Sequence, residues 1–141
     1  GFEERTRQIL KAYAGGVPVK IVKAGHSRQE SCRMMLAAAT QDTVVLHEAA
    51  RPFVTTDMLA DLIESSAPNA GYCQSIAFSM CQVDPHTQRI SHGVARDSVC
   101  NIQLPQKFLK SDLLQAHEVA AEAGATYNED AVMVVELTGQ H

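Results

Sequence analysis

With 141 residues, of which 45% are hydrophobic, the chain has the length and apolar content of about one globular domain, which argues against a disordered or fibrous protein. Its formal net charge of -4 gives no sign of the basic surface that binds nucleic acid or an anionic membrane. No secretory leader opens the sequence, and no apolar run approaches the ~18 residues that a membrane span requires. We therefore expect a cytoplasmic protein whose partners include neither nucleic acid nor membrane.

The first half of the chain alternates between two hydrophobic periods. Residues 2–13 place apolar side chains at helical spacing before a pair of glycines, which predicts a first helix. Residues 17–25 are rich in β-branched side chains and predict a strand. The segment 27–39 opens with Ser27 and Glu30 at the spacing of a capping box, which predicts a second helix.

The same alternation continues through the middle of the chain. Residues 43–47 form a short apolar run typical of a buried strand, 55–67 predict a capped helix, and 72–80 predict a third strand. The following segment contains Asp84 and a polar tip, which favour a hairpin-like turn. We place this protruding β-arm at about 80–102.

Two helices are predicted near the end of the sequence. The first covers 111–124 with Ser111 as its N-cap, and the second covers 128–139 with Asn128 as its N-cap. Alternating strands and helices predict an α/β fold with a mostly parallel, doubly wound sheet. In such a sheet ligands bind outside the carboxyl ends of the strands, so the loops after the first two strands are the places to seek a site.

The four cysteines are scattered and contain no CxxC pair. Cys32, Cys73 and Cys81 lie in apolar stretches, and Cys100 stands further along the chain. This spacing favours reduced thiols in the core over a zinc site or a disulfide framework.

The loop "AGHSRQES", which follows the first predicted strand, has two interpretations. Gly25 lets the backbone approach a ligand closely, and the N–H groups at the start of the next helix favour an anion or a polar ring edge. Alternatively the segment is an ordinary strand-to-helix turn with a capping box. The residues alone leave both interpretations open.

The loop "HEAARPF", which follows the second predicted strand, places an acid and a guanidinium close together. Glu48 suits a divalent cation or a ribose hydroxyl, and Arg51 suits a phosphate. The alternative is a structural ion pair between the two side chains, with His47 as a core histidine. Both interpretations remain open for this loop as well.

A third candidate lies in "VARDSVCNIQLPQKF". Arg96 could bind a phosphate, with Gln103, Pro105 and Gln106 forming a rigid polar turn at the end of a pocket. The alternative is a surface arginine paired with Asp97. Four further histidines lack metal-ligand spacing and are assigned to core, surface or tail: His86, His92, His117 and His141.

These three segments, together with "NEDAVMVVELTG", resemble in order and spacing the cytidylyltransferases that join CTP to a sugar-alcohol phosphate. The matching family patterns are GGxxRxxS, HDAxRPF, QTPQxF and TDDA, and the resemblance runs from about residue 17 to residue 139. The family comprises the enzymes for 2-C-methyl-D-erythritol 4-phosphate and for ribitol 5-phosphate. The pair "HEAARPF" and "LPQKF" is the most specific part of the match.

The resemblance implies an α/β, Rossmann-like fold in which the polyol phosphate attacks the α-phosphorus of CTP and pyrophosphate leaves. On the nucleotide side it implies that Gly25, His26 and Ser31 face the cytosine, with Ser31 hydrogen bonding to the base. Ala49 would contact the ribose. Mg²⁺ is the implied cofactor of such a reaction.

The resemblance also assigns three charged residues, two of them to the second substrate. Glu48 would be the metal or ribose carboxylate, and Arg51 and Arg96 would address the polyol phosphate. The two arginines would do so partly across the interface of a homodimer made by the arm. The family has aspartate at Glu48 and threonine at Leu104, so the acceptor of this chain can differ from that of the family.

The resemblance also bears on the extent of the domain. The family's N-terminal glycine-rich loop and its C-terminal lysine segment have no counterpart in the sequence. We therefore expect 1–141 to be a single but partial cytidylyltransferase-like domain, incomplete at the N-terminus and inactive or impaired by itself. The alternative is a non-catalytic binding or assembly module derived from the same fold.

Overall fold

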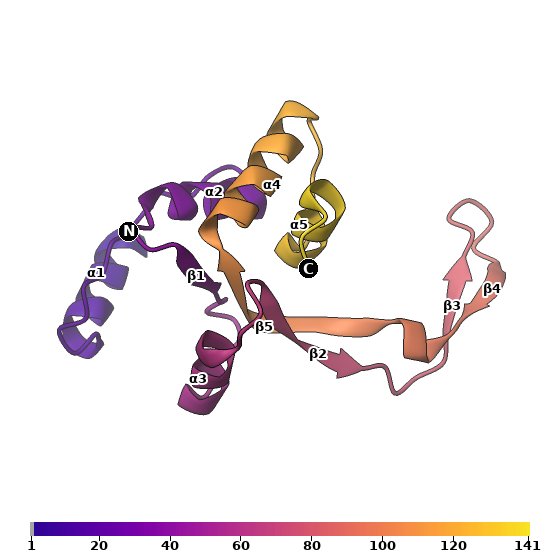
Figure 1. Ribbon diagram of the computed structural model, residues 1–141, viewed down its shortest axis with the longest axis horizontal. Coiled ribbons are helices and arrows are strands. Elements are labelled where there is room, and N and C mark those ends of the chain that lie inside the picture. The colour runs from indigo at the N-terminus through magenta and orange to yellow at the C-terminus, as the bar shows by residue number, and fades with distance from the viewer. Residues whose placement is uncertain (1) are drawn as a thin grey trace. The chain divides into compact units, whose positions relative to one another are not determined.

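The computed structural model describes residues 2–141, which divide into two units between Thr40 and Gln41 (Figure 1). The first unit contains α1 (Phe2–Tyr13) and α2 (Arg28–Ala38), and both helices confirm the sequence prediction. α1 is followed by Gly15 and Gly16, whose positive φ angles of 57° and 84° suit glycine and turn the chain out of the helix.

The strand predicted at 17–25 is wrong. These residues belong to no ladder among the described strands, although their side chains are β-branched. Such side chains favour an extended backbone, but a strand also needs a neighbour to accept and donate its hydrogen bonds. The composition therefore indicated a preference for extended backbone, but it could not indicate whether a neighbouring strand was present to pair with these residues.

The second unit is built on a three-stranded sheet with the order β1-β5-β2. Its strands are β1 (Thr43–Leu46), β2 (Ala70–Ser75) and β5 (Cys100–Leu109). The central strand β5 runs antiparallel to both neighbours, so the prediction of mostly parallel pairing is wrong for the described sheet. β1 and β2 run in the same direction but lie on opposite sides of β5. A short apolar run does not reveal the direction of its partner. The predicted burial of this strand is also wrong, because Thr43 is exposed and the other three residues of β1 are only half-buried.

The polar turn predicted at 103–106 is also wrong, because these residues lie inside β5. The register between β2 and β5 shifts between Gly71 and Tyr72, so two residues of β5, Pro105 among them, have no partner on β2. Proline has no N–H to donate to a ladder, and a bulge is one of the few places where a paired strand accepts it. The irregularity therefore lets β5 continue through a residue that usually ends a strand.

The hairpin lies between β2 and β5, within the segment where the sequence suggests an arm (Figure 1). It consists of β3 (Met80–Val83) and β4 (Ile90–Val94), which pair antiparallel. The Asp84 carboxylate accepts the N–H groups of two turn residues and so fixes the tip. A short 3₁₀ turn, η1 (Arg96–Ser98), then leads back to β5. The assignment of 1–141 to one domain remains a prediction.

Helix α3 (Thr56–Glu64) begins as predicted, since the hydroxyl of Thr55 accepts the Met58 N–H at 3.2 Å. Helix α4 (Lys110–Glu122) does not, because its N-cap is Leu109 and the predicted Ser111 cap is wrong. β5 runs directly into this helix, and the Lys110 N–H donates to the carbonyl of Asp42 at 2.7 Å. A neighbouring segment thus takes the place of a side-chain cap.

Helix α5 (Asp130–Thr138) ends at Gly139, whose φ of 68° is that of a left-handed helix end, as predicted. The predicted cap Asn128 is wrong, because the N-cap position belongs to Glu129. No helix within residues 2–141 has both the length and the apolar character needed to cross a bilayer. The buried side chains of this unit come mainly from β5, α4 and α5: Leu104, Phe108, Leu113, Ala116, Ala120, Met133 and Val134.

The prediction that the cysteines lie in the core holds for one of the four. Cys32 is buried in α2, whereas Cys73, Cys81 and Cys100 are exposed, and none of the described cysteines forms a disulfide. The apolar neighbours that suggested burial lie in β2 and in the arm. A strand with one uncovered face exposes alternate residues whatever the character of the run.

Candidate functional site

The loop after β1 folds back on itself and brings Glu48 close to Arg51. The Arg51 N–H donates to the Glu48 carbonyl at 2.9 Å, and the imidazole Nε2 of His47 lies 2.9 Å from the Arg51 carbonyl. The side chains then approach, with 3.9 Å between Arg51 Nε and Glu48 Oε2. Both are more than 40% exposed, so this ion pair contributes little to folding. His47 is exposed, so the alternative of a core histidine is wrong.

A residue of the central strand orients the Arg51 guanidinium. Arg51 Nη1 donates to the side-chain carbonyl of Gln103 at 2.6 Å, a contact that joins positions 52 residues apart. A guanidinium carries five N–H donors in a planar fork, more than these two contacts use. The sequence placed Gln103 near a phosphate site but did not reveal that it holds Arg51, because nothing local relates the two residues.

Arg51 and Gln103 line an open hollow of about 350 Å³ beside the end of β1. Its wall is otherwise mostly apolar, with contributions from Pro52, Phe53 and Leu104. A cationic fork at the rim of an apolar hollow is suited to a ligand that combines an anionic group with a carbon skeleton. Arg96 is not among the residues that line it. Its Nη1 donates to the Ala77 carbonyl at 3.1 Å, at the base of the arm.

In the first unit, the three residues predicted to face a base lie together before and within α2. The Gly25 N–H donates to the Ser31 hydroxyl at 3.0 Å, and that hydroxyl donates to the Ser27 carbonyl at 2.8 Å. The His26 N–H donates to the Glu30 carboxylate at 2.6 Å. A Cβ added at Gly25 would lie 2.5 Å from the side chain of Glu30, so any larger residue here would force Glu30 to move.

These contacts bear on whether the N-terminus of α2 is better suited to an anion or to the polar edge of a ring. The Glu30 carboxylate occupies the approach to the helix and Ser27 accepts the Glu30 N–H, so N–H groups that an anion would need are already engaged. A bound anion would also meet the negative charge of Glu30. The loop is therefore better suited to the polar edge of a ring than to a phosphate. Ala49 lies in the other unit, exposed between Glu48 and Arg51.

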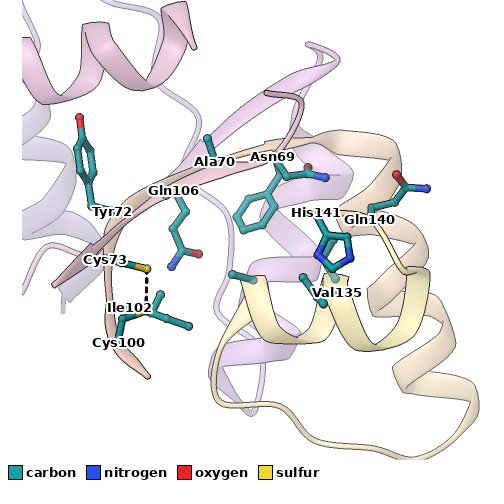
Figure 2. Close-up of a pocket in the computed structure, with 14 residues that line it drawn as sticks. Asn69, Ala70, Tyr72, Cys73, Cys100, Ile102, Gln106, Val135, Gln140 and His141 are labelled. Carbon is teal, nitrogen blue, oxygen red and sulfur yellow. Dashed lines mark hydrogen bonds between the residues drawn. The ribbon is translucent and has the colours of Figure 1, made fainter. Parts of the chain in front are cut away.

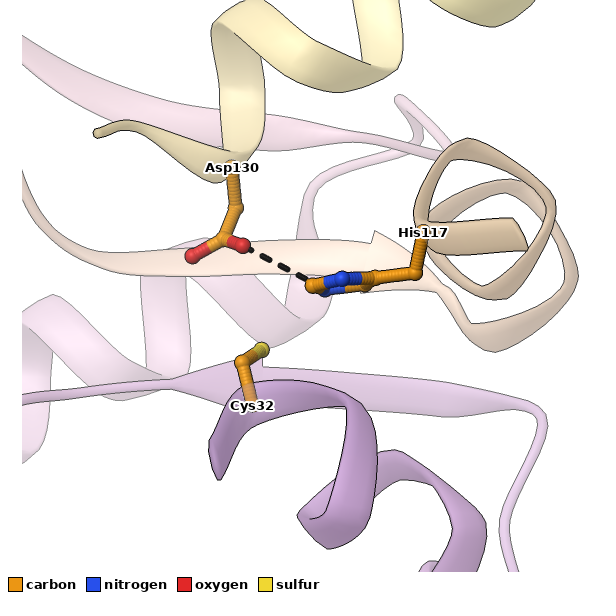
Figure 3. A group of neighbouring side chains, drawn as sticks. All are labelled: Cys32, His117 and Asp130. Carbon is orange, nitrogen blue, oxygen red and sulfur yellow. Dashed lines mark ion pairs between the residues drawn. The ribbon is translucent and has the colours of Figure 1, made fainter. Parts of the chain in front are cut away.

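A second polar group lies in the interior and was not anticipated. His117 of α4 and Asp130 of α5 are both nearly inaccessible, and the imidazole Nε2 lies 3.4 Å from the carboxylate Oδ1 (Figure 3). The sequence left His117 to the core, the surface or the tail, and the residue lies in the core. The acid at the start of α5 suggested a favourable charge at a helix N-terminus, and only the structure shows that it faces an imidazole.

The face of β2 and β5 toward α5 contains a further hollow of about 240 Å³ (Figure 2). Ile102, Phe108 and Val134 give it an apolar wall. Gln106 contributes a buried amide, whose Nε2 donates to the carboxylate of Glu129 at 2.9 Å. The match to the family pattern at "NEDA" therefore includes a residue that fastens the start of α5 to β5.

Comparison with known proteins gives one consistent result. A family model described as "IspD: 2-C-methyl-D-erythritol 4-phosphate cytidylyltransferase" matches residues 2–141. The 2-C-methyl-D-erythritol 4-phosphate cytidylyltransferase of Bacillus pumilus is 29% identical over 99% of this chain, which covers 62% of that protein. The enzyme of the same description from Deinococcus radiodurans is 31% identical over 86% of the chain, which covers 53% of it. The chain thus spans between half and two thirds of these relatives.

Solved structures agree on the fold. A 4-diphosphocytidyl-2C-methyl-D-erythritol synthase from Anaerococcus prevotii matches 98% of this chain with a TM-score of 0.85 and 21% identity, and the match covers 63% of that protein. The 2-C-methyl-D-erythritol 4-phosphate cytidylyltransferase of Thermus thermophilus matches 96% with a TM-score of 0.74 and 24% identity, and the match covers 75% of it. These likenesses confirm the α/β, Rossmann-like class.

Proposed function

This chain belongs to the 2-C-methyl-D-erythritol 4-phosphate cytidylyltransferase family, and from that premise we propose that its domain transfers CMP from CTP to a sugar-alcohol phosphate, with release of pyrophosphate. The chain spans 62% and 53% of two relatives, and we propose that by itself it is inactive or impaired. The acceptor is 2-C-methyl-D-erythritol 4-phosphate or ribitol 5-phosphate. The proposal includes a cytoplasmic location, which suits four cysteines that form no disulfide in the described residues.

The observation that carries the proposal is the orientation of Arg51. The contact with Gln103 holds the guanidinium at the rim of the hollow beside β1, and the Glu48 carboxylate lies 3.9 Å from its Nε. An arginine that is fixed by a second residue has lost part of its side-chain entropy before a phosphate arrives. In our proposal Arg51 binds the phosphate of the acceptor and aligns its attacking oxygen, which is the main catalytic task in such a transfer.

Glu48 suits the Mg²⁺ that the reaction requires. Mg²⁺ is usually held by one or two carboxylates together with substrate phosphates and water, and the Glu48 side chain is 42% exposed at the end of β1. A cation bound there would supply charge neutralisation for the phosphate oxygens. Arg51 would then contact the acceptor phosphate while Glu48 turns toward the metal.

The nucleotide base is assigned to the loop before α2. In our proposal Gly25, His26 and Ser31 face the cytosine, and the exposed His26 offers an imidazole while Ser31 offers a hydroxyl. The space left by the missing Cβ of Gly25 holds the Glu30 side chain. The Ser31 hydroxyl at present donates to the Ser27 carbonyl, so binding to the cytosine would exchange one hydrogen bond for another. Ala49 would contact the ribose.

Arg96 and the arm complete the proposal. Arg96 is exposed on η1 at the base of the arm, and we assign it to the acceptor phosphate of a partner subunit in a homodimer formed through the arm. Exposed apolar side chains on the arm and just before it support this role, since Phe78 is 81% and Ile90 72% exposed.

The test is pyrophosphate release by the full chain with CTP, Mg²⁺ and each polyol phosphate in turn, with ATP replacing CTP as the control. Release that requires both CTP and one of the acceptors supports the proposal, and the preferred acceptor names the branch of the family. Slow release is the expected result for this chain by itself, and binding of CTP with no release at all would instead favour the alternative of a non-catalytic module. If neither CTP nor an acceptor binds, the assignment of both substrates is wrong.

A further inference from the structure

Two thiols face each other across neighbouring strands of the sheet. Cys73 on β2 and Cys100 on β5 have their Sγ atoms 2.9 Å apart, joined by the dashed line in Figure 2. The strands are paired here, with Cys73 opposite Ile102 and Ser75 opposite Cys100, so the two cysteines form a diagonal pair. Both residues are exposed, and reagents in solution can therefore reach them.

The pair lies at the base of the arm. β2 ends at Ser75 and β5 begins at Cys100, and the chain between them forms the hairpin of β3 and β4 and the turn η1 (Figure 1). A covalent bond between Cys73 and Cys100 would therefore close a loop that contains the whole arm. Cys81 lies within that loop, on β3.

We propose that Cys73 and Cys100 are a redox-sensitive pair that forms an intramolecular disulfide when the protein meets hydrogen peroxide or an equivalent two-electron oxidant. One thiolate attacks a peroxide oxygen, which breaks the O–O bond and gives a sulfenic acid and one water after protonation. The second sulfur attacks the sulfenic sulfur, the S–S bond forms and a second water leaves. Two thiols are oxidised and one peroxide is reduced to two waters.

The geometry favours the second step over further oxidation. A disulfide places its sulfurs about 2 Å apart, so small side-chain rotations bring these two Sγ atoms to bonding distance. A sulfenic acid formed on either residue therefore meets its resolving thiol at once. Cys81, which no described cysteine approaches in this way, has no equivalent route.

The pH dependence of the reaction follows from the contact between the thiols. The hydrogen bond with Cys100 raises the pKa of Cys73, with smaller contributions from burial and from the charge of Cys100. The thiolate is the reactive form and a raised pKa makes it scarcer, so oxidation should become faster as the pH rises. The other titratable residues drawn in Figure 2 are Tyr72, whose hydroxyl donates to the Met58 carbonyl at 2.9 Å, and His141.

The experiment treats the reduced full chain with hydrogen peroxide and then alkylates the unfolded protein. We expect the number of alkylated cysteines to fall by two, and peptide mapping to recover one cross-linked pair, Cys73 with Cys100. Dithiothreitol should restore the full count. Amide hydrogen exchange near Ser75 and Cys100 should slow in the oxidised protein, because the bond fastens the two strand ends.

Three variants make the test specific. Cys81→Ser should still lose two alkylation sites on oxidation, whereas Cys73→Ser and Cys100→Ser should each fail to form the intramolecular cross-link. All three positions are exposed, so each variant should fold. The inference is overturned if peroxide leaves the count unchanged, oxidises single cysteines to sulfinic acid, or links either residue to Cys81 or to another molecule. None of these readouts depends on cytidylyl transfer.

Discussion

The Arg51 guanidinium donates to the Gln103 side chain at 2.6 Å, so the loop that leaves β1 is held by a residue of the central strand. A lysine at this position keeps the charge and loses the planar fork, so it cannot bind a phosphate through two parallel N–H groups. We expect Arg51→Lys to lower kcat/KM for the acceptor by about tenfold or more, with the larger share in KM.

The control for this variant is Arg7→Lys. Arg7 is also exposed and also has a carboxylate partner, Glu3, at 2.7 Å, but it lies on α1. Its replacement should leave both kinetic constants unchanged. The melting temperature should stay the same in both variants, because exposed ion pairs contribute little. Equal kinetics for Arg51→Lys and the wild type would remove Arg51 from the acceptor site.

Glu48 should determine the dependence on Mg²⁺. Glu48→Gln preserves the size of the side chain and removes its charge, so the Mg²⁺ concentration for half-maximal pyrophosphate release should rise about tenfold or more. Glu48→Asp keeps the charge on a side chain shorter by one methylene, and it should retain a metal requirement close to that of the wild type. A Mg²⁺ titration that is the same in all three proteins would exclude Glu48 as a metal ligand.

Gly25 should tolerate no side chain. Alanine there would bring its Cβ to 2.5 Å from Glu30, and the displaced side chain would lose the His26 N–H. Gly25→Ala should therefore cost about 1–3 kcal/mol in the free energy of unfolding, measured by urea denaturation. Gly93→Ala is the matched control, since a Cβ at Gly93 meets nothing within 4 Å. A neutral Gly25→Ala would show that Glu30 can move aside.

The buried pair of His117 and Asp130 should matter for stability. Asp130→Ala leaves the imidazole without its acid partner in an inaccessible place, which should cost about 1–3 kcal/mol in the free energy of unfolding. Asp130→Asn keeps an acceptor and should cost less. Asp57, an exposed acid in the first turn of α3, is the comparison, and Asp57→Ala should cost no more than about 1 kcal/mol. Equal losses at the two acids would mean that only the helix dipole is involved.

The tip of the arm should respond to acid. The Thr87 N–H donates to the Asp84 carboxylate at 3.0 Å and the His86 N–H at 2.8 Å, and these bonds hold the pKa of Asp84 below its ordinary value of 3.8. A lowered folded pKa means that the stabilisation is complete above pH 3.8 and is lost as the pH falls through the folded value. Amide chemical shifts of the two donors should therefore titrate with a midpoint below 3.8.

The same titration offers its own control. Asp84→Asn retains an acceptor for the turn and removes the ionisable group, so the pH dependence of the two amide shifts should vanish while the turn persists. A midpoint at or above the ordinary value in the wild type would contradict the two hydrogen bonds.

Local features were predictable from the sequence and contacts between distant residues were not. The turn that places Glu48 beside Arg51 depends on a few adjacent residues, and so does the cap at Thr55. The orientation of Arg51 depends on Gln103, which lies 52 residues later, and no local pattern encodes that distance.

The direction of strand pairing shows the same limit. The run in β1 predicts a buried strand in a parallel sheet, but β1 is only half-buried and its partner β5 is antiparallel. Burial leaves an apolar pattern in the sequence, whereas direction depends on how the chain returns to the sheet. The long excursion through the arm reverses the chain before β5, and this reversal sets the pairing. The exposure of Cys73 and Cys100 follows from the same arrangement, since it depends on which face of the sheet is covered.

β5 also has a mechanical consequence. It starts at the base of the arm with Cys100, ends at Leu109 and passes into α4 at Lys110 without a loop. At about 3.3 Å per residue its ten residues form a strut of about 33 Å. β5 pairs with β2 alone over its first four residues and with both neighbours at Gln106 and Lys107, so it bends most easily at the bulge beside Pro105, which lies between these two stretches. Force applied to the arm is therefore transmitted along β5 to the first turn of α4, and the bulge beside Pro105 is the most flexible point between them.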